Sequence, residues 1–235
     1  MSREVVLGRV RAALAAARTQ GAAHGTAAAP MELPALPAAG TLADPVGLFV
    51  ERGRAVAATV EVCASADDAA AQAAAWLAAR GARRLVAWDD PAIWAVAAQL
   101  AARGFEIAGP GAPVDVVAQA DAGLTGAAWG IAESASLVLP ADPRRPRLFS
   151  LLPPLHVAVL RADRIVADLP AWFARLAEGR PGGAGLPGAG AGAGTALPSA
   201  LALVTGPSRS ADIGLVPVQG AHGPMDVAVL VVMRP

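Results

Sequence analysis

The chain has 235 residues, of which 55% are hydrophobic, and 19 basic residues balance 19 acidic ones to give a formal net charge of zero. A neutral chain lacks the clustered positive field that nonspecific nucleic-acid binding requires, so nucleic acid is not an expected partner. No uninterrupted apolar stretch approaches the roughly 18 residues of a membrane span, and the N-terminus lacks the apolar core of a secretory signal, so we expect a cytoplasmic chain.

The beginning of the chain predicts an arm. Residues 4–18 place apolar side chains at helical spacing, whereas residues 21–45 carry four prolines, which disfavour both helix and central strand. Asp44 and Pro45 then supply a cap and a first-turn proline for a helix over 45–53. We therefore expect two regions, an N-terminal helix with a Pro/Ala-rich linker over residues 1–44 and an α/β domain over residues 45–235.

The first half of this domain alternates regularly between strand and helix patterns. β-branched, alternating segments predict strands, and Ala-rich segments that begin at a cap and end at glycine predict helices. Strand and helix alternation at this spacing indicates a mainly parallel, three-layer α/β sheet. The predicted strands cover 57–63, 84–88, 105–108 and 114–118, and the predicted helices cover 66–80, 91–103 and 121–128.

The second half of the domain is less regular. Residues 179–198 are nearly all Gly, Ala and Pro, a composition with almost nothing to bury, and predict a mobile loop. The other elements predicted here are strands over 131–139, 155–160, 201–205 and 227–232 and a helix over 170–178.

The segment Thr-Gly-Pro-Ser-Arg-Ser-Ala-Asp at residues 205–212 follows an apolar strand pattern. Strands of open α/β sheets present ligands at their carboxyl ends, so this segment is expected where binding occurs. Gly206, Ser208, Arg209 and Ser210 offer backbone amides, hydroxyls and a guanidinium that suit a carboxylate or a phosphate. The alternative is a strand-to-helix turn in which a serine caps the next element.

Three further places could carry chemistry. Glu133 interrupts an apolar strand pattern, so it needs either a structural partner or a role as a general base or nucleophile. The turn at residues 142–147 holds three arginines, which either clamp an anion or form a solvated loop. His222 stands between glycines that permit close approach of a ligand.

The remaining chemistry is restricted by composition. The chain contains one cysteine, Cys63, and no lysine or tyrosine. One cysteine cannot hold an iron–sulfur cluster, and the absence of lysine excludes Schiff-base catalysis. No His or Cys pair has metal-ligand spacing, so we expect no metal site and no cofactor in this chain.

Four segments taken in order resemble the LUD-domain family, specifically its lactate-utilisation protein C group. The segments are residues 130–139 (GIAESASLVL), 150–156 (SLLPPLH), 205–213 (TGPSRSADI) and 220–224 (GAHGP). Members of the family usually have Ala-Glu-Thr-Gly-Thr where this chain has Ala-Glu-Ser-Ala-Ser at 132–136. The hydroxyls of Ser134 and Ser136 therefore persist while a glycine is replaced by Ala135.

This resemblance implies a fold like that of the NagB, ribose-5-phosphate isomerase and CoA-transferase superfamily. It also implies a non-redox role in the oxidation of L-lactate beside two partner proteins that carry iron–sulfur clusters. An alternative is a stand-alone enzyme that acts on a phosphorylated or CoA-linked metabolite, with Glu133 as base or nucleophile and Arg209 as anion anchor. The sequence leaves open whether the chain forms a homo-oligomer and whether Glu133, Arg209 and His222 converge.

Overall fold

The computed structural model describes residues 3–23, 38–178, 198, 200–210 and 218–233. The chain divides into two compact units, Met1–Leu36 and Pro37–Pro235. Helix α1 (Arg3–Ala23) belongs to the first unit, and all other elements belong to the second. Most of the predicted linker and nearly all of the predicted Gly/Ala-rich loop lie outside the described residues.

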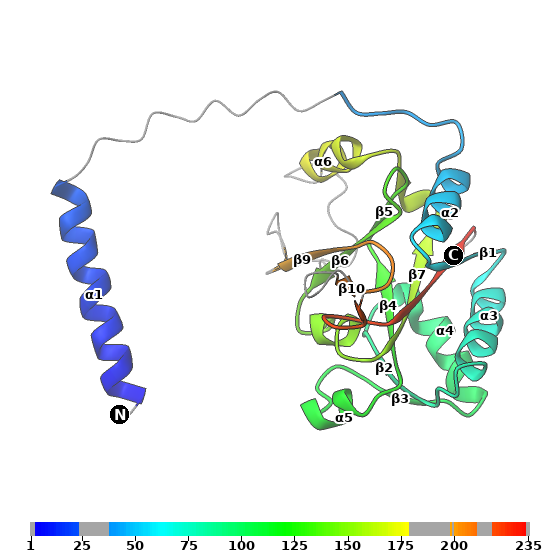
Figure 1. The fold of residues 1–235 in the computed structure, drawn as a ribbon, viewed down its shortest axis with the longest axis horizontal. Coiled ribbons are helices and arrows are strands. Elements are labelled where there is room, and N and C mark those ends of the chain that lie inside the picture. The colour runs from blue at the N-terminus through cyan, green and yellow to red at the C-terminus, as the bar shows by residue number, and fades with distance from the viewer. Residues whose placement is uncertain (1–2, 24–37, 179–197, 199, 211–217, 234–235) are drawn as a thin grey trace. The chain divides into compact units, whose positions relative to one another are not determined.

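A six-stranded sheet in which every neighbouring pair is parallel forms the centre of the second unit (Figure 1). The strand order is β1-β12-β7-β4-β2-β3. Strands β12, β7 and β4 lie inside this order and are buried along nearly their whole length, as expected for parallel strands covered on both faces. The strands are β1 (Thr59–Cys63), β2 (Arg84–Ala87), β3 (Glu106–Ala108), β4 (Ala122–Ala127), β7 (Leu155–Arg161) and β12 (Asp226–Val232).

Helices α3 (Ala66–Ala78) and α4 (Pro91–Ala102) pack against each other and against this sheet. The side chain of Ser65 accepts a hydrogen bond from Asp68 N at the start of α3, and Asp90 caps α4 in the same way. These caps are the local signals that predicted both helices. The buried face of α3 consists of Ala69, Ala70, Ala73 and Leu77, whose mostly small side chains permit close packing.

The other layer contains a second, smaller sheet with both parallel and antiparallel pairs. Its order is β8-β5-β6-β9, and its strands β5 and β6 contact β7 and β4 of the central sheet. The three-layer α/β prediction expects helices on both faces of the central sheet, but on this side the second sheet stands in the place of many of them. Its strands are β5 (Trp129–Ile131), β6 (Ser136–Ala141), β8 (Ile165–Val166) and β9 (Ala200–Val204).

Two helices and several short elements complete the unit. Helix α2 (Pro45–Ala55) packs on β1 and β8, and helix α6 (Leu169–Glu178) packs on β5 and β8 through the buried Trp172. Asp44 accepts a hydrogen bond from Gly47 N, so α2 begins as predicted. The short elements are α5 (Val114–Ala118), β10 (Arg209–Ser210), β11 (Val218–Gln219) and the 3-10 helices η1 (Arg147–Ser150) and η2 (Ala162–Arg164).

Two neighbouring predictions are wrong. The β-branched segment 114–118 was expected to be a strand but forms helix α5, in which Val114 and Val116 are exposed. Residues 121–128 were expected to be a helix but contain β4, a fully buried strand between β7 and β2. A Cβ at Gly123 would lie 1.8 Å from the carbonyl oxygen of Phe149, so glycine serves close backbone approach here. Tertiary packing therefore overrides the local propensity of residues 121–128.

Candidate functional site

Three hydroxyl groups form a row at the end of the β6–β9 pair. The strands are antiparallel with Leu137 opposite Val204, so Ser136 and Thr205 face each other at the next position. Ser136 Oγ lies 2.5 Å from Thr205 Oγ1 and 2.8 Å from Ser134 Oγ. Ser136 is buried, whereas Ser134 and Thr205 are exposed, so both ends of the row face solvent. Thr205 is not among the predicted site residues, because its place depends on the pairing of two distant strands.

Gly206 continues directly from this row and makes a tight turn. Its φ of +66° lies in the left-handed region that favours glycine. A Cβ at Gly206 would lie 2.9 Å from the carbonyl oxygen of Val56, which caps the end of α2. Both the backbone conformation and the close approach therefore require glycine at this position.

Ser208 ties the turn to the loop at residues 220–224. Its backbone nitrogen donates to the carbonyl oxygen of Pro224 at 2.8 Å, and its own carbonyl accepts from Gly220 N at 2.9 Å. Its Oγ also accepts a hydrogen bond from His222 N at 3.3 Å. The structure therefore places Ser208 and His222 next to each other, although the sequence separates them by 14 positions.

Arg209 follows in β10, opposite Gln219 of β11. Its side chain is exposed and forms no ion pair with any carboxylate of the described residues. The backbone of Ser210 pairs with Val218, but the side chain of Ser210 lies outside what the structure describes. A guanidinium that has no carboxylate partner in the described part of the chain, and that follows the hydroxyl of Ser208 in sequence, is suited to binding an anion.

The turn at Gly206 and Ser208 lies where the parallel strands of the central sheet begin. We call this side of the sheet the amino edge. Gly206 approaches Val56 before β1, Ser208 bonds to Pro224 before β12, and Met225 N bonds to Pro154 before β7. The expectation of a carboxyl-end site is therefore wrong. Strand β9 is not part of the parallel sheet but pairs antiparallel with β6 in the second sheet, so the rule for the carboxyl ends of parallel strands does not apply to it.

Glu133 does not lie inside a strand as predicted. A turn interrupts the predicted strand 131–139, and Glu133 stands exposed within it. Its backbone nitrogen donates to the carbonyl oxygen of Ala167 at 2.9 Å. Ala135 in the same turn has a φ of +51°, a conformation that glycine adopts more readily. Because Glu133 is exposed, burial of its carboxylate gives no reason to assign it a function. The turn nevertheless adjoins the hydroxyl row.

The profile of the LUD domain matches residues 46–232, which are nearly all of the second compact unit. The chain belongs to the LUD-domain family. Lactate utilization protein C of Deinococcus radiodurans is 37% identical over 120 residues, which cover 48% of this chain and 47% of the relative. Lactate utilization protein C of Exiguobacterium sp. is 30% identical over 151 residues, which cover 63% and 61%. The matches thus span about half the length of these relatives.

A solved structure supports the fold of this LUD domain. The crystal structure of a DUF162 family protein from Deinococcus radiodurans superposes with a TM-score of 0.54 at 24% identity. The superposition covers 81% of this chain and 97% of the other. At this level of identity the similarity concerns the fold.

The opposite, carboxyl edge of the LUD domain carries the predicted basic turn. Arg145 is buried, and its guanidinium bonds to Asp142 and lies 3.7 Å from Asp90. Arg144 donates to Asp89 at 2.9 Å. Carboxylates therefore neutralise both arginines. The exposed Arg144 fits the solvated-loop alternative, whereas the buried Arg145 does not.

The same contacts shift the pKa of the carboxyls. Hydrogen bonds from Arg144 and Trp94 lower the pKa of Asp89 below its ordinary value. Partial burial would raise the pKa of Asp142, but the hydrogen bonds and charge of Arg145 outweigh this effect and lower it. Both carboxylates therefore remain ionised under mildly acidic conditions.

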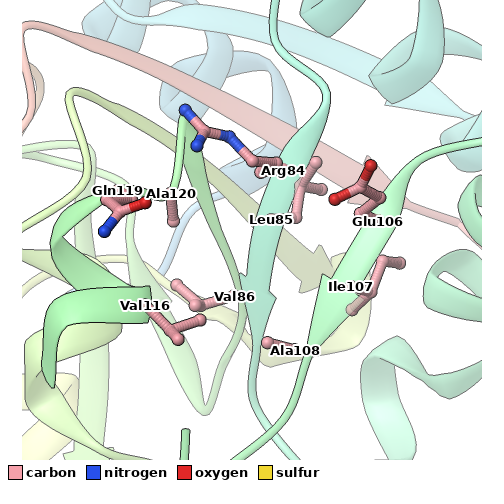
Figure 2. Close-up of a pocket in the computed structure, with 9 residues that line it drawn as sticks. All are labelled: Arg84, Leu85, Val86, Glu106, Ile107, Ala108, Val116, Gln119 and Ala120. Atoms are coloured by element: carbon pink, nitrogen blue, oxygen red, sulfur yellow. The ribbon is translucent and has the colours of Figure 1, made fainter. Parts of the chain in front are cut away.

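Two hollows adjoin the central sheet. The first, which we call the His222 groove, has a volume of about 390 Å³ at the amino edge. Its walls contain Leu148, Leu151, Leu152, Pro154, His222 and Met225. The second, of about 220 Å³, lies between β2, β3 and α5 (Figure 2). It contains none of the predicted site residues, and Arg84 on its wall is paired with Asp121.

His156 lies fully buried in β7, beneath the amino edge. Its Nε2 is 2.8 Å from Thr125 Oγ1, whereas its Nδ1 has no hydrogen-bond partner among the described residues. Burial lowers the pKa of His156 to about 4, so the ring is neutral at physiological pH. The described contacts of this neutral, enclosed imidazole are therefore structural ones within the domain.

Within the described part of the chain, no cluster of three or more His, Cys, Asp or Glu side chains could hold a metal ion. The helices described there also include none with the length and apolarity needed to cross a bilayer.

Proposed function

We propose that this LUD protein is a cytoplasmic, non-redox subunit of an L-lactate-oxidising system and acts with iron–sulfur partner proteins. In this role it binds a small carboxylate at the amino edge, through Arg209, Ser208 and the neighbouring backbone amides. Phosphate is the other anion that this set of donors suits.

Membership of the LUD-domain family, together with relatives named lactate utilization protein C, is the observation that carries this proposal. The amino-edge geometry adds independent support. The described residues 205–210 and 220–224, which carry part of the family resemblance, come together through the hydrogen bonds of Ser208. An exposed guanidinium adjoins them, and it lacks a described carboxylate partner.

The state of Cys63 is consistent with electron transfer in partner proteins. Cys63 is the chain's only cysteine and is buried, and burial raises the pKa of its thiol to about 11. A thiol in this state is a poor nucleophile, and a single one does not provide the ligand set of a cluster. Redox chemistry is therefore assigned to the partners in this proposal.

The alternative, a stand-alone enzyme of the CoA-transferase or isomerase type, depended on a buried Glu133. The exposed turn position of Glu133 removes that support. Similarity of fold alone does not establish catalysis.

Reconstitution tests the proposed role. Lactate-dependent dye reduction by the iron–sulfur partners should fall when this chain is left out and return when it is added back. Reduction that is equally fast without the chain would contradict the role.

Thermal unfolding tests the anion site separately. A ligand at about 100 times its dissociation constant stabilises the native state by roughly 2.7 kcal/mol. We expect lactate or pyruvate to raise the Tm of the wild-type chain and of Arg103→Gln, an exposed position on the α4 side of the sheet. The rise should be absent in Arg209→Gln. An equal rise in Arg209→Gln would exclude Arg209 as the anchor.

A further inference from the structure

We infer that the His222 groove binds the hydrocarbon side chain of a 2-hydroxycarboxylate larger than lactate, while the carboxylate is held at the Ser208–Arg209 turn. This inference rests on the proposed function and assigns a substrate class to the same site.

The groove is apolar and open. Leu148, Leu152 and Met225 expose 37%, 42% and 48% of their surface, although large apolar side chains are usually covered. Together they form a contiguous exposed patch along a concave surface, which is the arrangement typical of a binding groove. His222 is the polar side chain in this lining, so the groove offers an apolar surface with a single polar side.

Ser208 connects the groove to the proposed anion site. Gly220 and His222 both line the groove, and their backbone nitrogens donate to the carbonyl oxygen and the Oγ of Ser208. Arg209 is the next residue along the chain. A ligand whose carboxylate meets this turn therefore has the groove within reach of its remaining atoms.

The charges around the groove favour an anionic ligand. Five arginines of the domain form ion pairs with aspartates: Arg80, Arg84, Arg144, Arg145 and Arg161. Arg209 and Arg147, which immediately precedes Leu148 of the groove, form no ion pair with any described carboxylate. Arg209, which follows Ser208, and Arg147, which precedes Leu148, are thus two of the domain's arginines that lack a described carboxylate partner.

The size of the groove argues for a side chain larger than methyl. Its volume of about 390 Å³ falls within the range of roughly 300 to 1,000 Å³ that small-molecule sites occupy. The methyl group of lactate would leave most of this apolar surface in contact with water. A longer hydrocarbon chain would cover it, and the release of that water favours binding.

Calorimetric titration of the full chain with lactate, 2-hydroxybutyrate, 2-hydroxyhexanoate and 3-phenyllactate tests the inference. A fully buried methylene changes affinity by about fourfold, so we expect a rise of about twofold to fourfold per added methylene in this open groove. Leu152→Gln should flatten the series. Leu203→Gln, which alters a similarly exposed leucine on the edge strand β9, should leave it unchanged. Hexane-1,2-diol, which lacks the carboxylate, should bind far more weakly than 2-hydroxyhexanoate.

Lactate binding with no dependence on chain length would overturn the inference and leave the proposed function intact. Absence of binding by every acid would contradict the anion site itself. A chain-length dependence that persists in Leu152→Gln would place the hydrocarbon elsewhere. A flat series combined with loss of partner association or of self-association in Leu152→Gln would assign the groove to a protein surface and overturn the inference.

Discussion

The two edges of the central sheet use charge in different ways. At the carboxyl edge, Arg144 and Arg145 are paired with Asp89 and Asp142. At the amino edge, Arg209 is exposed, follows Ser208 along the chain and has no described carboxylate partner. A guanidinium that is already paired contributes to structure, whereas an unpaired one remains available to a ligand. This contrast between the two edges is the reason for proposing the anion site at the amino edge.

The largest effect that follows from this contrast concerns Arg145. Replacement by methionine would leave Asp142 and the nearby Asp90 without their buried partner, and removal of one partner of a buried ion pair costs about 3 kcal/mol or more. Arg144→Met is the matched control, because the Arg144–Asp89 pair is about half exposed and exposed ion pairs contribute little to stability. Urea unfolding measures both free energies. Equal losses in the two variants would contradict the structural role of Arg145.

Acid should weaken the amino edge through His156. The folded pKa of about 4 lies below the ordinary value of 6.5, so the unfolded chain binds the extra proton first as pH falls. This contribution to stability is fully present above about pH 6.5 and is lost toward pH 4. It amounts to about 3 kcal/mol at 1.36 kcal/mol per pKa unit.

The measurement is the free energy of unfolding at pH 7.5 and 4.5 for the wild type, His156→Gln and the exposed His222→Gln. The loss on acidification should shrink only in His156→Gln, whatever the starting stability of that variant. An unchanged loss would show that His156 titrates normally. The lowered pKa values of Asp89 and Asp142 keep the carboxyl edge ionised through this window.

A smaller effect is expected at Gly206. Alanine at a φ of +66°, with its Cβ 2.9 Å from the carbonyl oxygen of Val56, should cost about 1 to 2 kcal/mol and displace the turn. Gly81→Ala is the control, because Gly81 has a similar φ of +71° and its Cβ would meet nothing within 4 Å. The stability loss at Gly81 should therefore be smaller, and ligand-induced stabilisation should persist there but fall in Gly206→Ala.

Sequence alone predicted those features that depend on local signals. Asp44, Ser65 and Asp90 act as helix caps where the sequence indicates, and the sequence also singles out the segments 205–210 and 220–224, which the structure brings into contact. The family was also identified from the sequence, and the profile match confirms it.

Features that depend on distant contacts were missed. The sequence of β4 taken alone predicts a helix. It forms a strand between β7 and β2, where the carbonyl oxygen of Phe149 approaches it closely. The hydroxyl row needs the register of β6 against β9, and the position of the site at the amino edge needs the knowledge that β9 belongs to the second sheet. The sequence contains no local pattern from which these strand pairings could be predicted.

The central claim is that the amino-edge turn holds a carboxylate, and a crystal structure of the chain with a 2-hydroxycarboxylate tests it most directly. The account predicts the carboxylate within hydrogen-bond distance of Arg209 and Ser208, with the hydrocarbon side chain against Leu152. A carboxylate bound at the carboxyl edge, beside Arg144 and Asp89, would contradict it.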